Sequence, residues 1–327
     1  MPTADANPTP AMKITAISPW FGSKRMLAGD IVSELGPHKM YYETFCGSLA
    51  VLLEKPPAKY ETVCDLHDDL TNLARVIAQA GSAELLYDRL QRTLFAEGLL
   101  IEARTRMVAR LERGLGADGA PVDAIDWAYW FFLHSWAGRN GTAGSASMSF
   151  KICVRWTPNG GSATTRFRSA VESIPAWHER LRNVVILTRD AFDVHPSIPD
   201  EQGIALYCDP PYLHSTRSGN GDGGYRHDFA EAAAAPGSGG IFGQQAPQDH
   251  HARLAAQLAR FKLTRVVVSY YDHPRLKQLY PPAAGWRHVA KTMTKNLHVQ
   301  NRRGIGKREA PEVLIVNGPS LSEGGAA

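Results

Sequence analysis

The chain has 327 residues, of which 36 are Lys or Arg and 32 are Asp or Glu, and 44% are hydrophobic. This composition is that of a globular protein and excludes a disordered or fibrous chain. The net charge of +4 permits a basic face for a polyanion without indicating one. No apolar run approaches the roughly 18 residues of a membrane span, and the polar N-terminus lacks the hydrophobic core of a signal peptide. We therefore expect a soluble, cytoplasmic protein with no membrane partner.

The cysteine and histidine patterns do not predict a metal site. The four cysteines are far apart and form no C-x-x-C pair, which indicates reduced thiols: Cys46, Cys64, Cys153 and Cys208. The pair His250 and His251 has no third ligand at a useful spacing, so we expect both to cap and line a helix. No metal cofactor is predicted.

The N-terminal part of the chain predicts alternating strands and helices. A loop at residues 22–24 leads into a helix over 26–35, a strand over 40–45 turns at Gly47 into a helix over 49–53, and a strand over 62–64 ends at Asp65 before a further helix. A strand, a tight turn, a helix and a second strand that ends in an acid are typical of a nucleotide-binding βαβ unit.

The middle of the chain has a different character. From about Ser82 it is rich in Arg and Leu at helical spacing, continues into the aromatic run 127–132 and then into a polar Gly/Ser/Thr segment over 138–149, and ends in a helix through Trp177. We interpret residues 81–182 as an inserted, mainly helical domain. The aromatic run is predicted to form its core rather than to stack on bases.

Strand-like runs resume at residues 184–187, 204–207, 266–269 and 313–316, with a helix over 250–261 between two of them. The predicted fold class is therefore α/β, with a Rossmann-like, mostly parallel sheet and its active site at the carboxyl ends of the strands. The predicted catalytic domain comprises residues 13–80 and 183–319. Residues 1–12 and 320–327 are expected to be disordered ends.

The tetrapeptide Asp209-Pro210-Pro211-Tyr212 directly follows a predicted buried strand. Two consecutive prolines fix φ and remove two amide donors, so the turn is rigid and its carbonyls are available as acceptors. The Asp209 carboxylate and the Pro210 carbonyl can hold both hydrogens of an aromatic NH2, which draws the nitrogen toward tetrahedral geometry and frees its lone pair for attack. Tyr212 is predicted to stack on the base, a contact worth about 1–3 kcal/mol. The motif thus indicates an amine held against a methyl donor.

This tetrapeptide, preceded by Leu206-Tyr207-Cys208, resembles the D-P-P-Y motif of amino-methyltransferases. The order of cofactor motifs, insertion and catalytic motif is similar to that of the Dam-type, alpha-group DNA N6-adenine methyltransferases, which implies that the insertion over residues 81–182 is the target-recognition (DNA-binding) domain. The resemblance spans about residues 14–317. It implies an enzyme that transfers a methyl group from S-adenosyl-L-methionine to N6 of an adenine flipped out of double-stranded DNA, leaving S-adenosyl-L-homocysteine. It also implies a bacterial, phage or mobile-element protein that is a monomer or weak dimer.

The same resemblance implies the cofactor-binding residues. Trp20-Phe21-Gly22-Ser23-Lys24 is similar to the family's W-x-G-G-K segment, and residues 43–48 to its E-P-F-x-G loop. Asp65 corresponds to the acid that binds the ribose hydroxyls, and residues 190–192 to the segment beside the adenine. The implied cofactor residues are Trp20, Lys24, Phe45, Gly47, Asp65, Asp190, Phe192 and Asp209.

The chain also departs from the family pattern. Ser48-Leu49-Ala50 lies where the family usually has a second loop glycine, so we expect the backbone to approach the cofactor less closely there. Ser23 replaces a common glycine and Thr44 a common proline. These departures leave the catalytic groups in place.

Polar, Gly-rich segments bracketed by basic residues can follow phosphates and reach base edges. A solvated face is the alternative for each such residue. The predicted DNA contacts are Arg139, Asn140, Lys151, Arg155, Arg166, Arg168, Asn301 and Arg302.

Three alternative functions remain open at this point. Cytosine N4 methylation offers the same NH2 geometry to the same motif. A nucleotide-binding oxidoreductase shares the βαβ unit but requires G-x-G-x-x-G, which residues 45–50 do not supply. A catalytically silent DNA-binding module is disfavoured because the catalytic tetrapeptide is complete. The recognition sequence and a role in a restriction system do not follow from the sequence.

Overall fold

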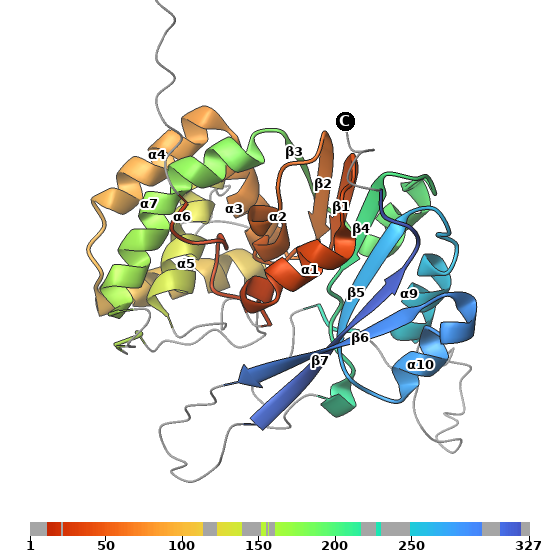
Figure 1. The fold of residues 1–327 in the computed structure, drawn as a ribbon. Coiled ribbons are helices and arrows are strands. Elements are labelled where there is room, and N and C mark those ends of the chain that lie inside the picture. The colour runs from red at the N-terminus through yellow and green to blue at the C-terminus, as the bar shows by residue number, and fades with distance from the viewer. Residues whose placement is uncertain are drawn as a thin grey trace, which may run out of the picture. The chain divides into compact units, whose positions relative to one another are not determined.

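A computed structural model describes the chain over residues 12–20, 22–113, 123–138, 152–154, 156, 161–216, 227–229, 249–295 and 308–321. Its internal contacts divide the chain into two compact units (Figure 1). Unit 1 contains residues 1–29, 46–188 and 222–226, and unit 2 contains residues 30–45, 189–221 and 227–327. Each unit is described separately.

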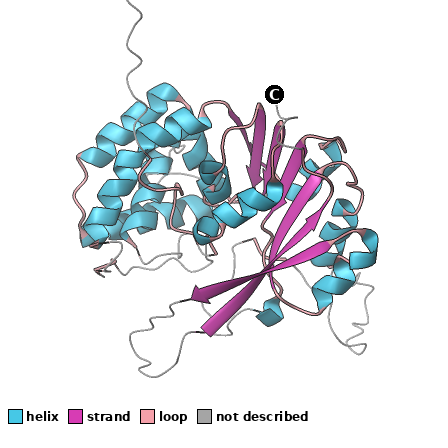
Figure 2. Cartoon of the chain, viewed as in Figure 1, coloured by secondary structure: helices cyan, strands magenta, loops and turns pink. Residues whose placement is uncertain are grey.

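Unit 2 contains five strands in the order β1-β4-β5-β7-β6, drawn as magenta arrows in Figure 2. The parallel strands are β1 (Met40–Thr44), β4 (Ile204–Cys208) and β5 (Arg265–Tyr271). Thr44 is in register with Cys208, and Cys208 with Val268, so these strands end side by side. The antiparallel strands are β7 (Arg308–Asn317) and β6 (Arg287–Lys295). The predicted mostly parallel α/β sheet is confirmed.

Short helices connect the strands of unit 2. They are α1 (Ala28–Leu35), α8 (Ala191–Val194), η3 (His195–Ser197), η4 (His214–Thr216), α9 (His250–Leu258), α10 (Arg275–Leu279) and η5 (Pro282–Ala284). Aspartates begin two of them, because Asp190 accepts a hydrogen bond from the amide of Phe192 and Asp249 accepts from that of His251. Helix α9 packs against η3 and α10.

Unit 1 has two parallel strands, β2 (Tyr60–Asp65) and β3 (Val184–Thr188), with Asp65 in register with Thr188. Its α-helices carry the labels α2 to α7 in Figure 1. The helices of this unit are η1 (Lys24–Met26), α2 (Ala50–Glu54), α3 (Asp68–Ala78), α4 (Ala80–Gln91), α5 (Glu97–Arg113), α6 (Ala124–Ala137) and α7 (Ala163–Leu181). The described part of the predicted insertion is thus mainly helical, while its boundaries stay a prediction.

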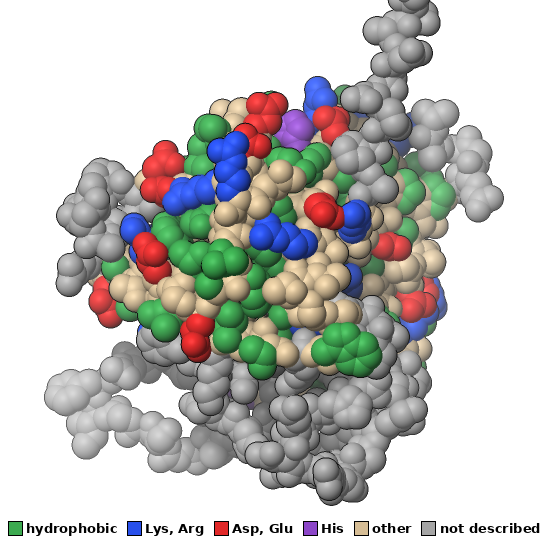
Figure 3. All heavy atoms as spheres, turned by 90° about the vertical axis from the view of Figure 1, so that its left-hand side faces the viewer, with side chains coloured by type: hydrophobic (Ala, Val, Ile, Leu, Met, Phe, Trp, Pro, Cys, Tyr) green, Lys and Arg blue, Asp and Glu red, His purple; other side chains and the backbone are tan. Residues whose placement is uncertain are grey.

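The aromatic run lies in α6, whose residues from Ala128 to Ala137 are all buried. This confirms the prediction that the run is core for residues 128–132, whereas Trp127 is half-buried. Arginines cover its edge: the guanidinium of Arg89 lies 3.8 Å from the ring centre of Tyr129, and that of Arg106 lies 4.7 Å from Trp130. On the outer face of the molecule shown in Figure 3, basic and acidic side chains alternate with hydrophobic ones.

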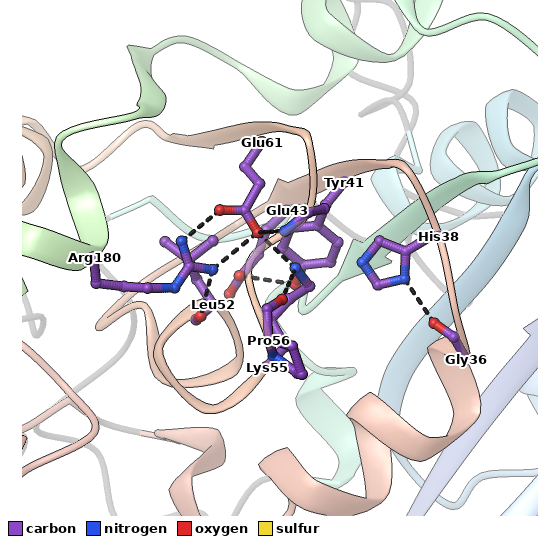
Figure 4. A network of polar contacts seen from close by, with 10 residues as sticks. Gly36, His38, Tyr41, Glu43, Leu52, Lys55, Pro56, Glu61 and Arg180 are labelled. Atoms are coloured by element: carbon purple, nitrogen blue, oxygen red, sulfur yellow. Dashed lines mark hydrogen bonds and ion pairs between the residues drawn. The ribbon is translucent and has the colours of Figure 1, made fainter. Parts of the chain in front are cut away.

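A buried ionic cluster links α7 to the beginning of β2 (Figure 4). Glu61 accepts hydrogen bonds from Lys55 at 2.6 Å and from Arg180 at 2.9 Å. The amide of Ala58 donates to the same carboxylate, and Arg180 also donates to the carbonyl of Leu52. Every formal charge in the cluster therefore has a partner, as burial requires.

Three further outcomes concern the predictions at the level of the fold. Strand β6 was not predicted from the sequence, and β7 begins at Arg308, before the predicted run 313–316. Residues 1–11 and 322–327 of the predicted disordered ends lie outside the described residues. In the described parts of the chain, no helix has the length and apolarity required of a membrane span.

Candidate active site

The tetrapeptide Asp209-Pro210-Pro211-Tyr212 begins immediately after β4, whose five residues are all buried. Both prolines and Tyr212 are buried, and Asp209 is half-buried. Because β4 lies between β1 and β5, the tetrapeptide lies at the carboxyl edge of the parallel strands. Its predicted position after a buried strand is confirmed.

Tyr212 is packed between other aromatic rings of unit 2. Its ring meets Tyr271 edge-on at 4.6 Å and also contacts Tyr270 at 5.8 Å. Its hydroxyl donates to Oε2 of Glu312 across 3.5 Å. No role was assigned to Glu312 from the sequence; the signal for it was an acid directly before the apolar run 313–316. The stacking of Tyr212 on a base stays a prediction.

Three carboxylates surround the end of β4. Burial raises the pKa of Tyr207 well above its ordinary value, and the carboxylates of Asp209, Glu43 and Glu312 act in the same direction. Glu43 is buried on β1 and accepts a hydrogen bond from Tyr41 at 2.9 Å (Figure 4). A cluster of acids in a largely buried site creates a negative field. Such a field favours a group that is, or becomes, positively charged.

An aromatic cluster in unit 2 contains two of the predicted cofactor residues. Phe192 stacks on Phe229 at 5.6 Å, and Phe45 meets the same ring edge-on at 5.6 Å. His250 contacts both Phe192 and Phe229, and the guanidinium of Arg253 lies 4.2 Å from the ring centre of Phe192. Phe45 has φ +67°, a strained conformation for a non-glycine residue. Phe229 therefore contacts the rings of both Phe45 and Phe192. This contact was not predicted from the sequence.

The predicted cofactor residues of unit 1 are also brought together. Asp65 accepts hydrogen bonds from the amides of Gly47 and His67, each at 2.8 Å. Trp20 contacts the ring of His67 edge-on at 4.9 Å. Ser48 lies 3.2 Å from Ser23, Oγ to Oγ, which ties the Gly47 loop to the N-terminal segment. The two segments that the sequence placed 25 residues apart thus form one structure.

Two predicted cofactor residues also make local structural contacts. The ammonium of Lys24 is buried and donates to the carbonyl of Gly22 at 2.8 Å. Asp190 caps the N-terminus of α8 through its hydrogen bond from Phe192. Their contacts with a cofactor stay predictions.

Most predicted DNA contacts lie outside the described residues: Arg139, Asn140, Lys151, Arg155, Asn301 and Arg302. Arg166 lies on α7 and donates to the carbonyl of Gly161 at 3.3 Å. Arg168 donates to the carbonyls of Gln91 and Thr93 at 2.9 and 2.7 Å, at the C-terminal end of α4. These contacts give Arg168 a structural role.

In the described part of the chain, one group of side chains has the spacing of metal ligands: His67, Asp68 and Asp69. Arg110 donates to Asp68 at 2.8 Å and to Asp69 at 2.6 Å, and the indole of Trp127 donates to Asp69 at 2.8 Å. A guanidinium therefore already supplies the positive charge at this position. His250 and His251 begin α9, as the sequence predicted.

A family model matches this chain over residues 20–105: the D12 class N6 adenine-specific DNA methyltransferases. The match supports the predicted family over these residues. It covers the Trp20 segment, the Gly47 loop and Asp65, and ends before Asp209. The matched family consists of methyltransferases, for which S-adenosylmethionine is the methyl donor.

No curated protein matches the chain. Two solved structures are similar to it over most of its length. Precorrin 8w decarboxylase from Methanobacterium thermoautotrophicum is 9% identical, with 90% of each chain covered and a TM-score of 0.34. Precorrin-6y C5,15-methyltransferase from Geobacter metallireducens GS-15 is also 9% identical, with 89% of this chain and 85% of that chain covered and a TM-score of 0.31. Likenesses at this level carry no functional argument.

Proposed function

We propose that this chain is a DNA methyltransferase that transfers a methyl group from S-adenosylmethionine to the N6 amine of adenine in double-stranded DNA. The observation that carries the proposal is the tetrapeptide Asp209–Tyr212 at the end of buried β4, in a chain whose residues 20–105 match the D12 class. The target adenine has to leave the base stack, because its amine is inaccessible to such a site within a duplex.

The residues of the site fit the methyl donor. In unit 2, the phenyl rings of Phe45 and Phe192 offer apolar faces for its adenine. When bound, S-adenosylmethionine supplies a positively charged sulfonium that carries the transferable methyl group. The negative field of Glu43, Asp209 and Glu312 has the sign that attracts this charge.

The protein's own contribution to the reaction is positioning and charge stabilisation. Asp209 and the carbonyl of Pro210 each accept one hydrogen of the target NH2, which directs the nitrogen lone pair at the methyl carbon. The rigid Pro210-Pro211 turn keeps these acceptors in place. As the nitrogen becomes cationic, the carboxylates around Tyr207 stabilise the developing charge. A proton leaves only after transfer, to Asp209 or to water, so the step needs no separate general base.

Mass spectrometry of nucleosides tests the proposal directly. The purified chain is incubated with unmethylated duplex DNA and S-adenosylmethionine, and the DNA is then digested to nucleosides. We expect N6-methyladenine. N4-methylcytosine would overturn the choice of base but keep amine methylation, and the absence of any methylated nucleoside would overturn the function.

Two variants locate the chemistry. Asp209→Ala is expected to lower kcat at least 100-fold, because the amine loses one of its two acceptors. Asp88→Ala, which removes an exposed acid of α4, is the matched control and is expected to retain full activity. A folded and fully active Asp209→Ala protein would contradict the assigned role.

A further inference from the structure

A chain of buried hydrogen bonds runs beneath the candidate site in unit 2. Oγ1 of Thr44 lies 2.9 Å from Nε2 of His195. The other ring nitrogen of His195 lies 3.0 Å from Oε1 of Gln257, whose amide nitrogen donates to the carbonyl of Phe192 at 3.0 Å. At the opposite end, Sγ of Cys208 lies 3.2 Å from Oγ1 of Thr44. His195, Thr44 and Cys208 are all buried.

The orientation of the Gln257 amide determines which atom donates and which accepts in the hydrogen bonds that follow it. Its amide nitrogen is used as a donor to Phe192, so its oxygen faces His195 and accepts the Nδ1 hydrogen. Burial lowers the pKa of His195 to about 4, so the ring is neutral and carries one proton. Nε2 then accepts from the Thr44 hydroxyl. The Thr44 oxygen in turn accepts from the Cys208 thiol, whose pKa burial raises to about 12.

Three members of this hydrogen-bond chain adjoin residues of the candidate site. Thr44 directly precedes Phe45, which is held at φ +67°, and Cys208 directly precedes Asp209. Gln257 holds the carbonyl of Phe192 itself. The hydrogen bonds therefore join β1, β4, η3 and α9 at the positions from which the candidate cofactor and amine contacts project.

The Thr44 hydroxyl is a direct donor to the buried Nε2 of His195, at 2.9 Å. Sγ of Cys208 lies farther from the same nitrogen, at 3.8 Å. The ring of His195 also lies 6.5 Å from that of Phe45, edge-on.

We propose that Thr44 and His195 are positioning residues, whose directed hydrogen bonds fix the backbone that carries Phe45 and Phe192. This inference rests on the proposed function, since it assigns both of those residues to the methyl donor. Loss of the Thr44 hydroxyl displaces Phe45 and α8, while the Asp209–Tyr212 turn remains fixed by its own prolines. The defect should therefore fall on binding of the donor more than on turnover.

The matched pair Thr44→Val and Thr44→Ser isolates the hydroxyl. Valine has nearly the shape of threonine without the hydroxyl, and serine keeps the hydroxyl. We expect Thr44→Val to raise the KM for S-adenosylmethionine about tenfold with kcat changed less than about twofold, as loss of one buried hydrogen bond predicts. Thr44→Ser should restore KM to near the wild-type value. Equal KM values in all three proteins would overturn the proposal. A Thr44→Val protein in which kcat and thermal stability both fall as KM rises would also overturn it.

The tautomer of His195 supplies a readout that does not depend on activity. Long-range 1H–15N correlation spectra distinguish protonated from unprotonated ring nitrogens, and the signals of His195 are those lost in His195→Gln. We expect Nδ1 to be protonated and Nε2 to be unprotonated at neutral pH. The reverse tautomer would contradict the assignment of donors and acceptors in this series of hydrogen bonds. If the wild-type protein shows this tautomer but methylates no DNA, the proposed function fails while the hydrogen-bond chain stands.

Discussion

The indole of Trp20 lies so close to Gly47 that a Cβ on residue 47 would be 3.1 Å from the indole nitrogen and 3.2 Å from Cδ1. Gly47 also has φ +46°, in the left-handed region where other residues are strained. The amide of the same glycine donates to Asp65. A single residue thus determines how closely the Trp20 segment, the loop and the end of β2 approach one another.

Gly47→Ala is therefore expected to destabilise the protein by about 1–2 kcal/mol and to weaken binding of S-adenosylmethionine. Urea unfolding and calorimetric titration measure the two effects. Gly81→Ala is the control: Gly81 lies in helix α4 with no atom within 4 Å of the position of its Cβ. That variant should be neutral or up to about 1 kcal/mol more stable. Indistinguishable stabilities of the two variants would contradict the role of Gly47.

Glu61→Gln is expected to destabilise the protein by about 3 kcal/mol or more, because it leaves Lys55 and Arg180 buried without their shared anion. Burial acts to raise the pKa of Glu61, but the hydrogen bonds from Arg180 and Lys55 lower this pKa below its ordinary 4.5. The unfolded chain therefore takes up a proton first as the pH falls below 4.5, and stability that is complete above that pH is lost. Urea unfolding of both proteins at neutral and acidic pH measures this. An unchanged acid dependence in Glu61→Gln would contradict it.

The sequence predicts those parts of the fold that have a local signal. Strands β4 and β5 are short apolar runs with clear ends, and Asp209 follows the first of them without a gap. Asp65 is recognisable because it ends a strand before a helix. Each of these features depends on neighbours in sequence.

The features that the sequence did not predict depend on distant partners. Strand β6 has the sequence RHVAKTMTK, without an apolar run, and forms because β7 pairs with it. Thr44 and His195 are 151 residues apart, and Tyr212 and Glu312 are 100 apart. Local patterns of hydrophobicity and charge carry no information about such pairs.

Arg168→Ala is expected to affect folding rather than DNA binding. Its guanidinium donates to the carbonyls of Gln91 and Thr93 at the end of α4, and loss of these bonds should cost about 1–2 kcal/mol in urea unfolding. The slope of DNA affinity against salt concentration should not change, because no phosphate contact is removed. Arg182→Ala, at the C-terminal end of α7, removes an exposed pair with Glu179 and should cost less than about 0.5 kcal/mol. A salt slope reduced by about one in Arg168→Ala, with stability intact, would instead make it a phosphate contact.

The pKa of His195 gives the stability a second pH dependence, in a different window from that of Glu61. Burial lowers this pKa from 6.5 to about 4; Arg260 adds to the effect, while Gln257 and Asp190 oppose it. Between these values the unfolded chain binds a proton that the folded chain does not, so stability is lost as the pH falls. Between about pH 6.5 and 5, where Glu61 does not contribute, the loss should be about 2 kcal/mol.

The measurement is the free energy of unfolding in urea at several pH values in this window, for the wild type and His195→Gln. The variant is expected to be less stable at every pH, because its amide cannot reproduce both ring contacts, but its stability should depend less on pH. His214→Gln serves as the control, since His214 is half exposed and pairs with Asp228 at 3.2 Å. The slope of the unfolding free energy against pH decides the outcome. The stability itself would also fall in the variant if His195 only filled space and did not titrate. Equal slopes for the wild type and His195→Gln would show that this ring does not remain neutral through burial.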